Sequence, residues 1–385
     1  MNIEWICDLR APSGYGRAAR ADMRALIRAG IEPRVTVHRH DQTELDLSRD
    51  KFWAKRLRTV LKPSAELPDI SIWQETPEFY RADPTRANVS RIEWETSAIV
   101  DYNHSGISTY NWVSQLNQMT EVWAASKFVA EVLRDSGVET PCHVIPHPVD
   151  LETFKKKDRT YVGGPPERSI NKDRFTVLAL FQYTKRKNPE ALLTAWSRSK
   201  LGRQNDCALL LKTYGGDFQH THPITNMIRE FRAHLNIPGM KANVYPLTRL
   251  IHEDEMPNIY NAADVFLCTS YGEGFGLPVS EAMACGLPVV YTNATAVPEF
   301  AVGYPVDCRP EPVFGMPHIP WYSATQNWWG IDTLDLVRKL EQAYDDWKSG
   351  KLEELGDRAR SRVEELHSDE RVGQMLRERV EALAG

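Results

Sequence analysis

Hydrophobic residues along this chain follow two alternating patterns. Short apolar runs of strand length are followed by longer segments in which apolar residues recur every three or four positions, as in amphipathic helices. Alternation of this kind is typical of an α/β fold with a parallel sheet. Before residue 153 we predict strands at 3–9, 34–38, 69–73, 91–95, 121–124 and 143–145 and helices at 17–29 and 127–136. After residue 174 we predict strands at 176–181, 208–212, 243–247, 265–269 and 288–292 and helices at 189–197, 224–235, 253–261 and 278–284.

The same architecture therefore occurs twice, and a polar stretch at 153–174 separates the two series. This stretch is rich in turn-forming residues and lacks periodicity. A chain of 385 residues also exceeds what one core usually organises. We predict an N-terminal domain at 1–152, a linker at 153–174 and a C-terminal domain at 175–368. The charged tail is expected to form two helices with Ser368 capping the second, and the helix at 369–385 is expected to pack back on the first domain.

Composition and charge narrow the class of protein. The chain is 42% hydrophobic and 26% charged, as ordinary globular proteins are. Its net charge of −5 gives no overall attraction for nucleic acid, so duplex nucleic acid is not an expected partner. No apolar run approaches the roughly 18–20 residues that span a bilayer, and the six cysteines are scattered without a C-x-x-C. We therefore expect a soluble, cytoplasmic protein with reduced thiols.

Residues 49–62 form a cationic segment with an apolar side. Six basic residues are mixed with apolar ones that include Phe52 and Trp53. As a helix, this segment could lie on an anionic membrane surface as a peripheral contact, or hold an acidic acceptor. A solvated helix that packs by its apolar side is the favoured alternative.

The most informative stretch is a glycine-rich loop between the predicted strand at 265–269 and the predicted helix at 278–284. Its glycines let the backbone approach a ligand closely, and a helix start beyond the carboxyl end of a strand is a common phosphate site. Carboxylates beside a diphosphate would be repelled, so we expect Glu273 and Glu281 to face sugar or ribose hydroxyls. A plain glycine-rich turn, with Glu281 as a favourable helix charge, is the structural alternative.

Glu273 and Glu281 form an E-x(7)-E pair within the sequence EGFGLPVSEAMACGLPVV. This pattern resembles the donor-site signature of the retaining GT-B glycosyltransferases of the group 1 type. The preceding YNAADVFL, and the earlier segments EVWAASKF and VIPHPVD, resemble other parts of that family. The resemblance covers most of the chain but is weak at 52–84 and 310–329. It implies a GT-B fold, with two Rossmann-like domains facing a cleft.

The resemblance also implies roles for individual residues. Backbone amides of the loop would contact the donor phosphates, Glu281 would bind the ribose and Glu273 the transferred sugar. Lys187 stands at the position of a lysine that pairs with the diphosphate. Gln182 or Tyr183 replaces the usual arginine, so Arg186 or Lys185 would substitute for it. The amides concerned are those of Gly274, Phe275, Gly276 and Leu277.

Two features of the first half would belong to the same site. Gly14 and Gly16 follow the first strand, where the family carries a glycine-rich loop that faces the diphosphate; an ordinary strand–helix turn is the alternative. Related enzymes place a histidine near the position of His104 that hydrogen-bonds the transferred sugar, although a surface-loop histidine explains it equally well. For His147, packing beside two prolines is the favoured interpretation.

The sequence offers no metal site. The H-x-H pairs at 38–40 and 220–222 lack a nearby cysteine or carboxylate set, and no D-x-D occurs. The helix dipole and a lysine could neutralise the leaving diphosphate instead. We therefore expect no metal and no cofactor, and a UDP-, GDP- or ADP-sugar as co-substrate.

The predicted reaction is transfer of a hexose to an acceptor hydroxyl with retention of anomeric configuration. The acceptor is open: glycan, lipid, protein and modified nucleobase all fit. A sugar-nucleotide epimerase on the same fold, a non-catalytic sugar-nucleotide-binding protein and a nicotinamide dehydrogenase are alternatives, the last disfavoured because Ala19 stands where a dinucleotide fingerprint has its third glycine.

Overall fold

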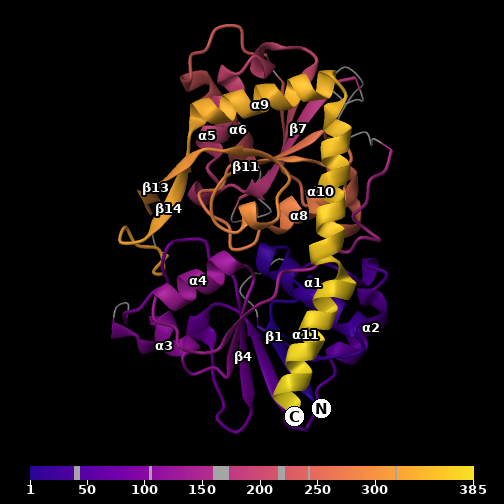
Figure 1. The fold of residues 1–385 in the computed structure, drawn as a ribbon, viewed down its shortest axis with the longest axis vertical. Helices are drawn as coiled ribbons and strands as arrows, with labels where there is room; N and C mark the ends of the chain where they lie inside the picture. Colours follow the sequence, from indigo (N-terminus) through magenta and orange to yellow (C-terminus); the bar gives the residue numbers. More distant parts are fainter. Residues whose placement is uncertain (39–43, 104–105, 159–172, 216–221, 242, 317–318) are drawn as a thin grey trace. The chain divides into compact units, whose positions relative to one another are not determined.

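The computed structural model describes residues 1–38, 44–103, 106–158, 173–215, 222–241, 243–316 and 319–385. The chain divides into two compact units (Figure 1). Unit 1 comprises Met1–Asp150, Pro312–Asn327 and Glu365–Gly385, and unit 2 comprises Leu151–Glu311 and Trp328–Glu364. The predicted linker lies largely outside the described residues. The second predicted domain ran unbroken to residue 368, whereas the structure places Pro312–Asn327 in unit 1.

Unit 1 is built on a six-stranded parallel sheet of order β2-β1-β3-β4-β5-β6. Most strand interiors are buried, which agrees with the apolar runs that predicted them. The strands are β1 (Ile3–Cys7), β2 (Arg34–Val37), β3 (Ile70–Gln74), β4 (Ala87–Ile92), β5 (Glu121–Ala124) and β6 (Cys142–Val144).

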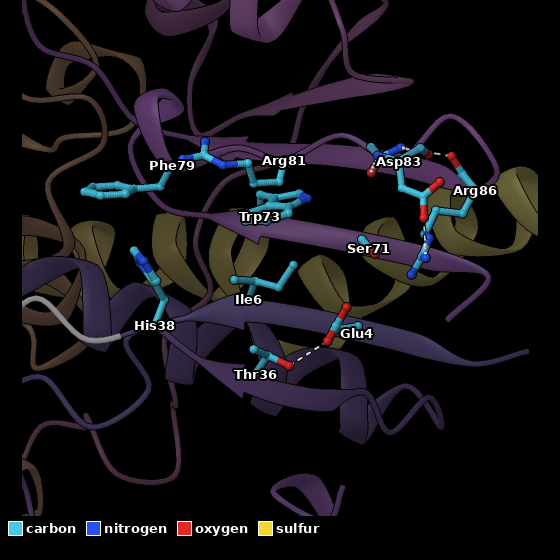
Figure 2. Close-up of a pocket in the computed structure, with 11 residues that line it drawn as sticks. Glu4, Ile6, Thr36, His38, Ser71, Trp73, Phe79, Arg81, Asp83 and Arg86 are labelled. Carbon is cyan, nitrogen blue, oxygen red and sulfur yellow. Dashed lines mark hydrogen bonds and ion pairs between the residues drawn. The ribbon is translucent and has the colours of Figure 1, made fainter. Parts of the chain in front are cut away.

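The helices of unit 1 lie on both sides of this sheet. Trp5, Val372 and Leu376 share one core, so α1 and α11 cover one face together. The opposite face carries α3 and α4 at one end and an open cavity at the other (Figure 2). The helices are α1 (Gly14–Arg28), α2 (Trp53–Val60), α3 (Trp112–Leu116), α4 (Lys127–Asp135) and α11 (Asp369–Ala384), with 3-10 turns η1 (Leu47–Arg49), η2 (Pro77–Phe79) and η4 (Ser108–Tyr110).

The C-terminal helix is fixed to α1 by close backbone approach and by charge. A Cβ on Gly373 would lie 2.4 Å from the Ala25 carbonyl oxygen, so only glycine allows this approach. Arg24 Nε donates to Asp369 at 2.8 Å. The Ser368 side chain accepts from the amide of Arg371, which confirms the predicted cap and the break between the two tail helices.

The segment Pro312–Asn327 is attached to unit 1 by aromatic stacking. Tyr322 stacks on Trp94 with ring centroids 5.4 Å apart, and Trp321 stacks on Trp112 at 5.6 Å. Gln326 donates from Nε2 to the Ala98 carbonyl at 2.9 Å. These partners lie more than two hundred positions away in sequence, beyond the reach of local periodicity.

The cationic segment at 49–62 is helical only over Trp53–Val60. Trp53 and Val60 are each 1% exposed and belong to the core of unit 1. Its apolar side is thus occupied by the protein itself, as in the favoured alternative, and is not available to a bilayer. Among the described residues, no helix combines the length and the apolar character needed to cross a membrane.

Unit 2 has a second six-stranded parallel sheet, of order β12-β11-β10-β7-β8-β9. The chain winds outward from β7 through β9, returns to the centre at β10 and winds outward again in the other direction. The strands are β7 (Phe175–Gln182), β8 (Cys207–Tyr214), β9 (Val244–Leu247), β10 (Val265–Cys268), β11 (Val289–Thr292) and β12 (Gly303–Val306). A separate pair, β13 (Cys308–Pro312) and β14 (Asn327–Ile331), flanks the segment that joins unit 1.

The helices of unit 2 pack on the faces of this sheet, around a core that includes Phe175, Trp196 and Leu340. They are α5 (Pro189–Arg198), α6 (His222–His234), α7 (Met256–Tyr260), α8 (Leu277–Ala284), α9 (Thr333–Lys348) and α10 (Lys351–His367), with 3-10 turns η6 (Lys185–Lys187), η7 (Leu201–Arg203), η8 (Glu253–Glu255) and η9 (Val297–Glu299).

Candidate functional site

The glycine-rich loop lies at the point where the strand order of unit 2 reverses. β7 and β10 are neighbours in the sheet, and their carboxyl ends lead into the basic turn η6 and into the loop 269–276. Ligands of open α/β sheets bind beyond the carboxyl ends of the strands at such a switch point. The topology therefore places the predicted residues at the edge of the sheet where a ligand is expected.

The start of α8 depends on Gly276. This residue is the N-cap with φ 99°, a left-handed conformation that favours glycine, and a Cβ there would lie 3.2 Å from Val297 Cγ2. No side chain caps the helix. Phe275 is buried and stacks on Phe300 with ring centroids 5.2 Å apart, so this aromatic contact fixes the loop before the helix.

Glu273 is the centre of a charged cluster. Its Oε1 accepts from Lys187 Nζ at 2.5 Å and from Ser270 Oγ at 2.6 Å, and its Oε2 lies 3.4 Å from Arg186 Nη1. Its amide donates to Thr295 Oγ1 at 3.1 Å. The side chains of Glu273, Lys187 and Arg186 are 14%, 16% and 21% exposed, so the cluster is largely screened but still reachable from solvent.

The charge state of Glu273 follows from these neighbours. Burial would raise the pKa of its carboxyl, but the charges of Lys187 and Arg186, with hydrogen bonds from Lys187 and Ser270, lower it to about 2. Glu273 is therefore ionised at every physiological pH and can only accept hydrogen bonds.

The basic turn is bonded directly to the loop that carries Glu273. Arg186 Nη1 donates to the Gly272 carbonyl at 2.9 Å, and Thr269 Oγ1 donates to the Lys187 carbonyl at 3.1 Å. Asn188, with φ 54°, ends the turn in a left-handed conformation and caps α5 by accepting from the amide of Ala191. Backbone geometry thus presents Lys187 and Arg186 to Glu273 before any ligand binds.

Glu281 lies deeper than the sequence suggests. It is 5% exposed, in the second turn of α8, and its Oε2 accepts from the hydroxyl of Tyr260 at 2.6 Å. Tyr260, at the end of α7, is fully buried and holds this carboxylate in one orientation.

The two N-terminal glycines differ in their surroundings. A Cβ on Gly16 would lie 2.3 Å from the Ala11 carbonyl oxygen, so Gly16 is required for packing of the loop against α1. A Cβ on Gly14 would have no heavy atom within 4 Å. Arg20 fixes the same loop by donating to the carbonyls of Leu9 and Ala11 at 2.6 and 2.9 Å. Steric packing alone therefore explains why glycine stands at position 16, without a ligand.

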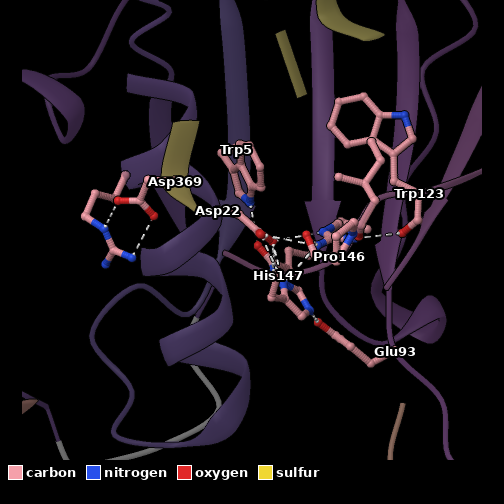
Figure 3. Close-up of polar contacts among 11 residues, drawn as sticks. Trp5, Asp22, Glu93, Trp123, Pro146, His147 and Asp369 are labelled. Carbon is pink, nitrogen blue, oxygen red and sulfur yellow. Dashed lines mark hydrogen bonds and ion pairs between the residues drawn. The ribbon is translucent and has the colours of Figure 1, made fainter. Parts of the chain in front are cut away.

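Unit 1 also contains a buried ionic network around Asp22 of α1 (Figure 3). Asp22 of α1 accepts from Arg91 Nε at 2.9 Å and lies 3.0 Å from His147 Nδ1. Glu93 Oε1 lies 2.5 Å from His147 Nε2, although the two groups are not aligned as a regular hydrogen bond. Arg91 also donates to the Ile145 carbonyl at 2.5 Å. The network joins β4, α1 and the segment after β6.

The protonation of this network is set by burial and by its charges. Burial would raise the pKa of Asp22, but Arg91 and His147 lower it to about 2. For His147, burial and the Arg91 charge would lower the pKa, but Asp22 and Glu93 raise it. Carboxylates lie near both ring nitrogens and the Arg91 guanidinium lies 2.8 Å from Nδ1, so His147 is a member of the ionic network around Asp22. The prediction that His147 merely packs between prolines is therefore incomplete.

Comparison with known proteins finds relatives of part of the sequence and of the whole fold. Residues 173–307 match the family model described as glycosyl transferases group 1. Two solved structures resemble the whole chain. HepE of Anabaena with UDP and glucose is 16% identical over 99% of each chain with a TM-score of 0.64. The sucrose-phosphate synthase of Thermosynechococcus elongatus is 17% identical over 100% of this chain and 99% of that one, with a TM-score of 0.67. The fold is GT-B.

Curated relatives match shorter parts of the chain. The O-antigen chain mannosyltransferase B of Escherichia coli is 49% identical over 49 residues, 13% of this chain and 13% of that protein. A D-inositol 3-phosphate glycosyltransferase of Streptomyces bingchenggensis is 27% identical over 192 residues, 46% of this chain and 40% of that protein. The chain thus spans less than half the length of these two relatives.

Within this GT-B fold, the structure brings several predicted residues together. Glu273, Lys187 and Arg186 form one cluster, and Gly274 to Leu277 lead from it into α8. Lys185 instead pairs with Glu190 at 3.7 Å. His104 lies outside the described residues. Gly14 and Gly16 belong to unit 1.

Sequence reasoning missed the residues that orient the two carboxylates. Ser270 donates to the Glu273 carboxylate, Thr295 accepts from the Glu273 amide, and Tyr260 donates to the Glu281 carboxylate. A polar residue directly after a buried strand, as Ser270 is, was an available signal; Tyr260 gave none, because it reads as one more apolar position of a helix. Across the described part of the chain, no group of three or more His, Cys, Asp or Glu side chains has a metal-binding arrangement.

Proposed function

We propose that this protein is a glycosyltransferase that moves a hexose from a nucleotide-diphosphate sugar to an acceptor hydroxyl and retains the anomeric configuration. The observation that carries the proposal is the Glu273–Lys187–Arg186 cluster beside the start of α8, at the switch point of the second sheet. The family match over residues 173–307 supports it. UDP and glucose in the HepE structure, and the mannosyltransferase relative, suggest UDP-glucose and GDP-mannose as the first donors to test.

The charges of the cluster suit a diphosphate leaving group next to a neutral sugar. Glu273, Lys187 and Arg186 together carry one more positive than negative charge, and the start of α8 adds about half a positive charge. The cations would lie against the diphosphate. Glu273, fixed as a carboxylate, would be repelled by phosphate and would accept hydrogen bonds from hydroxyls of the transferred sugar.

The proposed chemistry needs no nucleophile from the protein. The bond from the anomeric carbon to the phosphate oxygen breaks, and the acceptor oxygen bonds to that carbon on the same face of the sugar. The acceptor proton passes to the departing phosphate oxygen. Lys187, Arg186 and the helix start would stabilise the charge that develops on the leaving group, without a metal. Glu281, held by Tyr260, would bind the ribose, and the amides of 274–277 the phosphates.

Glu273→Gln tests the division of roles within the cluster. It removes a negative charge and frees Lys187, so free UDP or GDP should bind as tightly as before or more tightly. The sugar nucleotide should lose about 1–2 kcal/mol, roughly 5- to 30-fold, because neutral hydrogen bonds replace charged ones. Calorimetric titration measures both. Glu364→Gln, on the exposed surface of α10, is the matched control.

Gly276→Val tests the helix start. It should abolish nucleotide binding, whereas Gly350→Val, which bears similar backbone strain at φ 80° but has open space around it, should not. Thermal shift with the panel of UDP-, GDP- and ADP-sugars gives the readout. Equal binding by Gly276→Val and the parent would overturn the proposal.

Incubation with the sugar nucleotide alone, followed by NMR, separates a transferase from an epimerase. A transferase hydrolyses the sugar nucleotide slowly, whereas an epimerase converts it to another sugar nucleotide.

A further inference from the structure

Among the described residues of unit 1, no helix covers one face of the sheet over β2, β1 and β3. A cavity of about 440 Å³ lies there, lined by strand residues, by η2 and by the loops around it, with no residue of a described α-helix (Figure 2). Ile3 and Trp5 point to the core under α1 and α11, so Glu4 and Ile6 point to this other face, as alternation along a strand requires. Parallel sheets normally have both faces covered.

The floor of this groove is polar where a helix-covered face would be apolar. Thr36 of β2 donates to Glu4 of β1 at 2.5 Å, and buried Ser71 continues the polar floor on β3. Asn88 of β4 is also buried, and its amide bonds to the backbone of Asp83 and Arg86. A surface for a protein partner would have an apolar centre depleted of charge. A polar floor with exposed Thr36 and half-buried Glu4 suits a ligand that carries hydrogen-bonding groups.

Aromatic side chains stand at the end of the groove nearest the carboxyl edge. Phe79 lies against His38 with ring centroids 4.8 Å apart, and Trp73 rises from β3 beside them (Figure 2). The Nε1 of Trp73 is buried and has no hydrogen-bond partner among the described residues. Aromatic side chains beside polar strand residues suit a ring that is apolar on its faces and hydroxylated at its rim.

The charges in the groove are balanced. Arg86 pairs with Asp83, Glu4 lies on the opposite side, and the guanidinium of Arg81 donates to the carbonyls of Glu78 and Tyr80. A phosphorylated or polyanionic ligand would require a surplus of positive charge, which this lining lacks. A neutral ligand fits the lining better.

The length of the groove favours a chain of sugars over a single one. Glu4 pairs in register with Arg34, and His38 lies four residues beyond Arg34 along the same direction. Four residues of strand span about 13 Å, which is longer than one pyranose ring. The groove therefore runs from the amino-terminal half of the sheet to the edge at which ligands of α/β sheets bind.

We propose that this groove binds a neutral oligosaccharide, as a holding site for a glycan acceptor or product. The choice of a glycan rests on the proposed function, but the site itself lies wholly in unit 1 and is tested by binding alone. It would keep a growing chain attached between transfers and would favour longer acceptors.

Thr36→Arg tests the groove, because Thr36 is exposed and a long side chain there would lie across it and pair with Glu4. Thr59→Arg, an exposed threonine on α2, is the matched control. Phe79→Ala is a second variant that removes an aromatic wall. The probes are an array of neutral and acidic oligosaccharides, then calorimetric titration with the strongest neutral hit and the corresponding monosaccharide.

The parent and Thr59→Arg should bind the oligosaccharide and not the monosaccharide, while Thr36→Arg and Phe79→Ala should bind at least tenfold more weakly. Absence of any neutral hit, or equal binding by Thr36→Arg, would overturn the inference. A dimer that Thr36→Arg dissociates, without glycan binding, would instead make this face a protein interface. Nucleotide-sugar binding should survive in Thr36→Arg, so a failure here is distinct from a failure of the proposed transferase.

Discussion

Removal of the Asp22 carboxylate should destabilise unit 1 strongly and locally. Asp22 and Arg91 have side chains that are 0% exposed, and Asp22 also accepts from Gln74 Nε2 at 3.0 Å and pairs with His147. Asp22→Asn keeps the size of the side chain but offers a single acceptor oxygen. Donors of Arg91 or His147 would then face the new amide group, which is itself a donor.

The expected cost can be worked out in two ways. Removing one partner of a buried ion pair costs about 3–5 kcal/mol, because the other charge stays buried without compensation. The lowering of the Asp22 pKa from 3.8 to about 2 corresponds to about 2 kcal/mol at neutral pH. That part is present above pH 3.8 and is lost as the pH falls through about 2, since the folded state holds the proton more weakly than the unfolded chain. We expect Asp22→Asn to lower the free energy of unfolding by about 3–5 kcal/mol at pH 7, a range that includes the part of about 2 kcal/mol from the Asp22 pKa.

Hydrogen exchange read by mass spectrometry is the suitable assay, because it reports each unit separately. Protection of β4 amides should fall by about a hundredfold to a few thousandfold in Asp22→Asn. Protection of β7 and β8 in unit 2 should not change. Glu381→Gln is the control, because its pair with Arg377 is 51% and 46% exposed and should contribute less than about 0.5 kcal/mol. A loss below about 1 kcal/mol for Asp22→Asn, or the same loss for Glu381→Gln, would refute the electrostatic reasoning.

Two further substitutions test the orientation of the site. Tyr260→Phe removes the hydroxyl that donates to buried Glu281, which should cost about 1–3 kcal/mol in thermal unfolding and weaken sugar-nucleotide binding measured by titration; unchanged affinity would separate Glu281 from the ligand. Gly16→Ala should lower the free energy of unfolding, because its Cβ would clash with the Ala11 carbonyl. Gly14→Ala should leave the free energy of unfolding unchanged within about 0.5 kcal/mol. Equal effects of the two alanines would contradict the packing role of Gly16.

Elements buried on both faces could be predicted well from the sequence. β5 was predicted at 121–124 and occupies Glu121–Ala124, where all four residues are buried. The break at Ser368 followed from one capping residue. The switch-point loop was predictable because the strand before it and the helix after it both follow from local pattern, and both are present as β10 and α8.

Features made by distant partners could not be predicted in the same way. Periodicity reports whether a position is buried and does not report against what. The stacking of Tyr322 on Trp94 joins residues that no local pattern connects, so the assignment of Pro312–Asn327 to unit 1 was missed. The open groove was missed for a related reason. Its polar strand positions look like ordinary alternation until the sheet shows that no described helix covers them.

Asp22 shows where a sequence does contain an unused signal. It stands between Ala18 and Ala25 at helical spacing, in the middle of the buried stripe of α1. A carboxylate cannot be buried there without a cation, so the residue alone implies a partner. That partner comes from β4 and from the segment after β6, as Arg91 and His147, and both converge on the Asp22 carboxylate. A charged residue on the apolar stripe of a predicted helix therefore predicts a buried ion pair with a distant part of the chain.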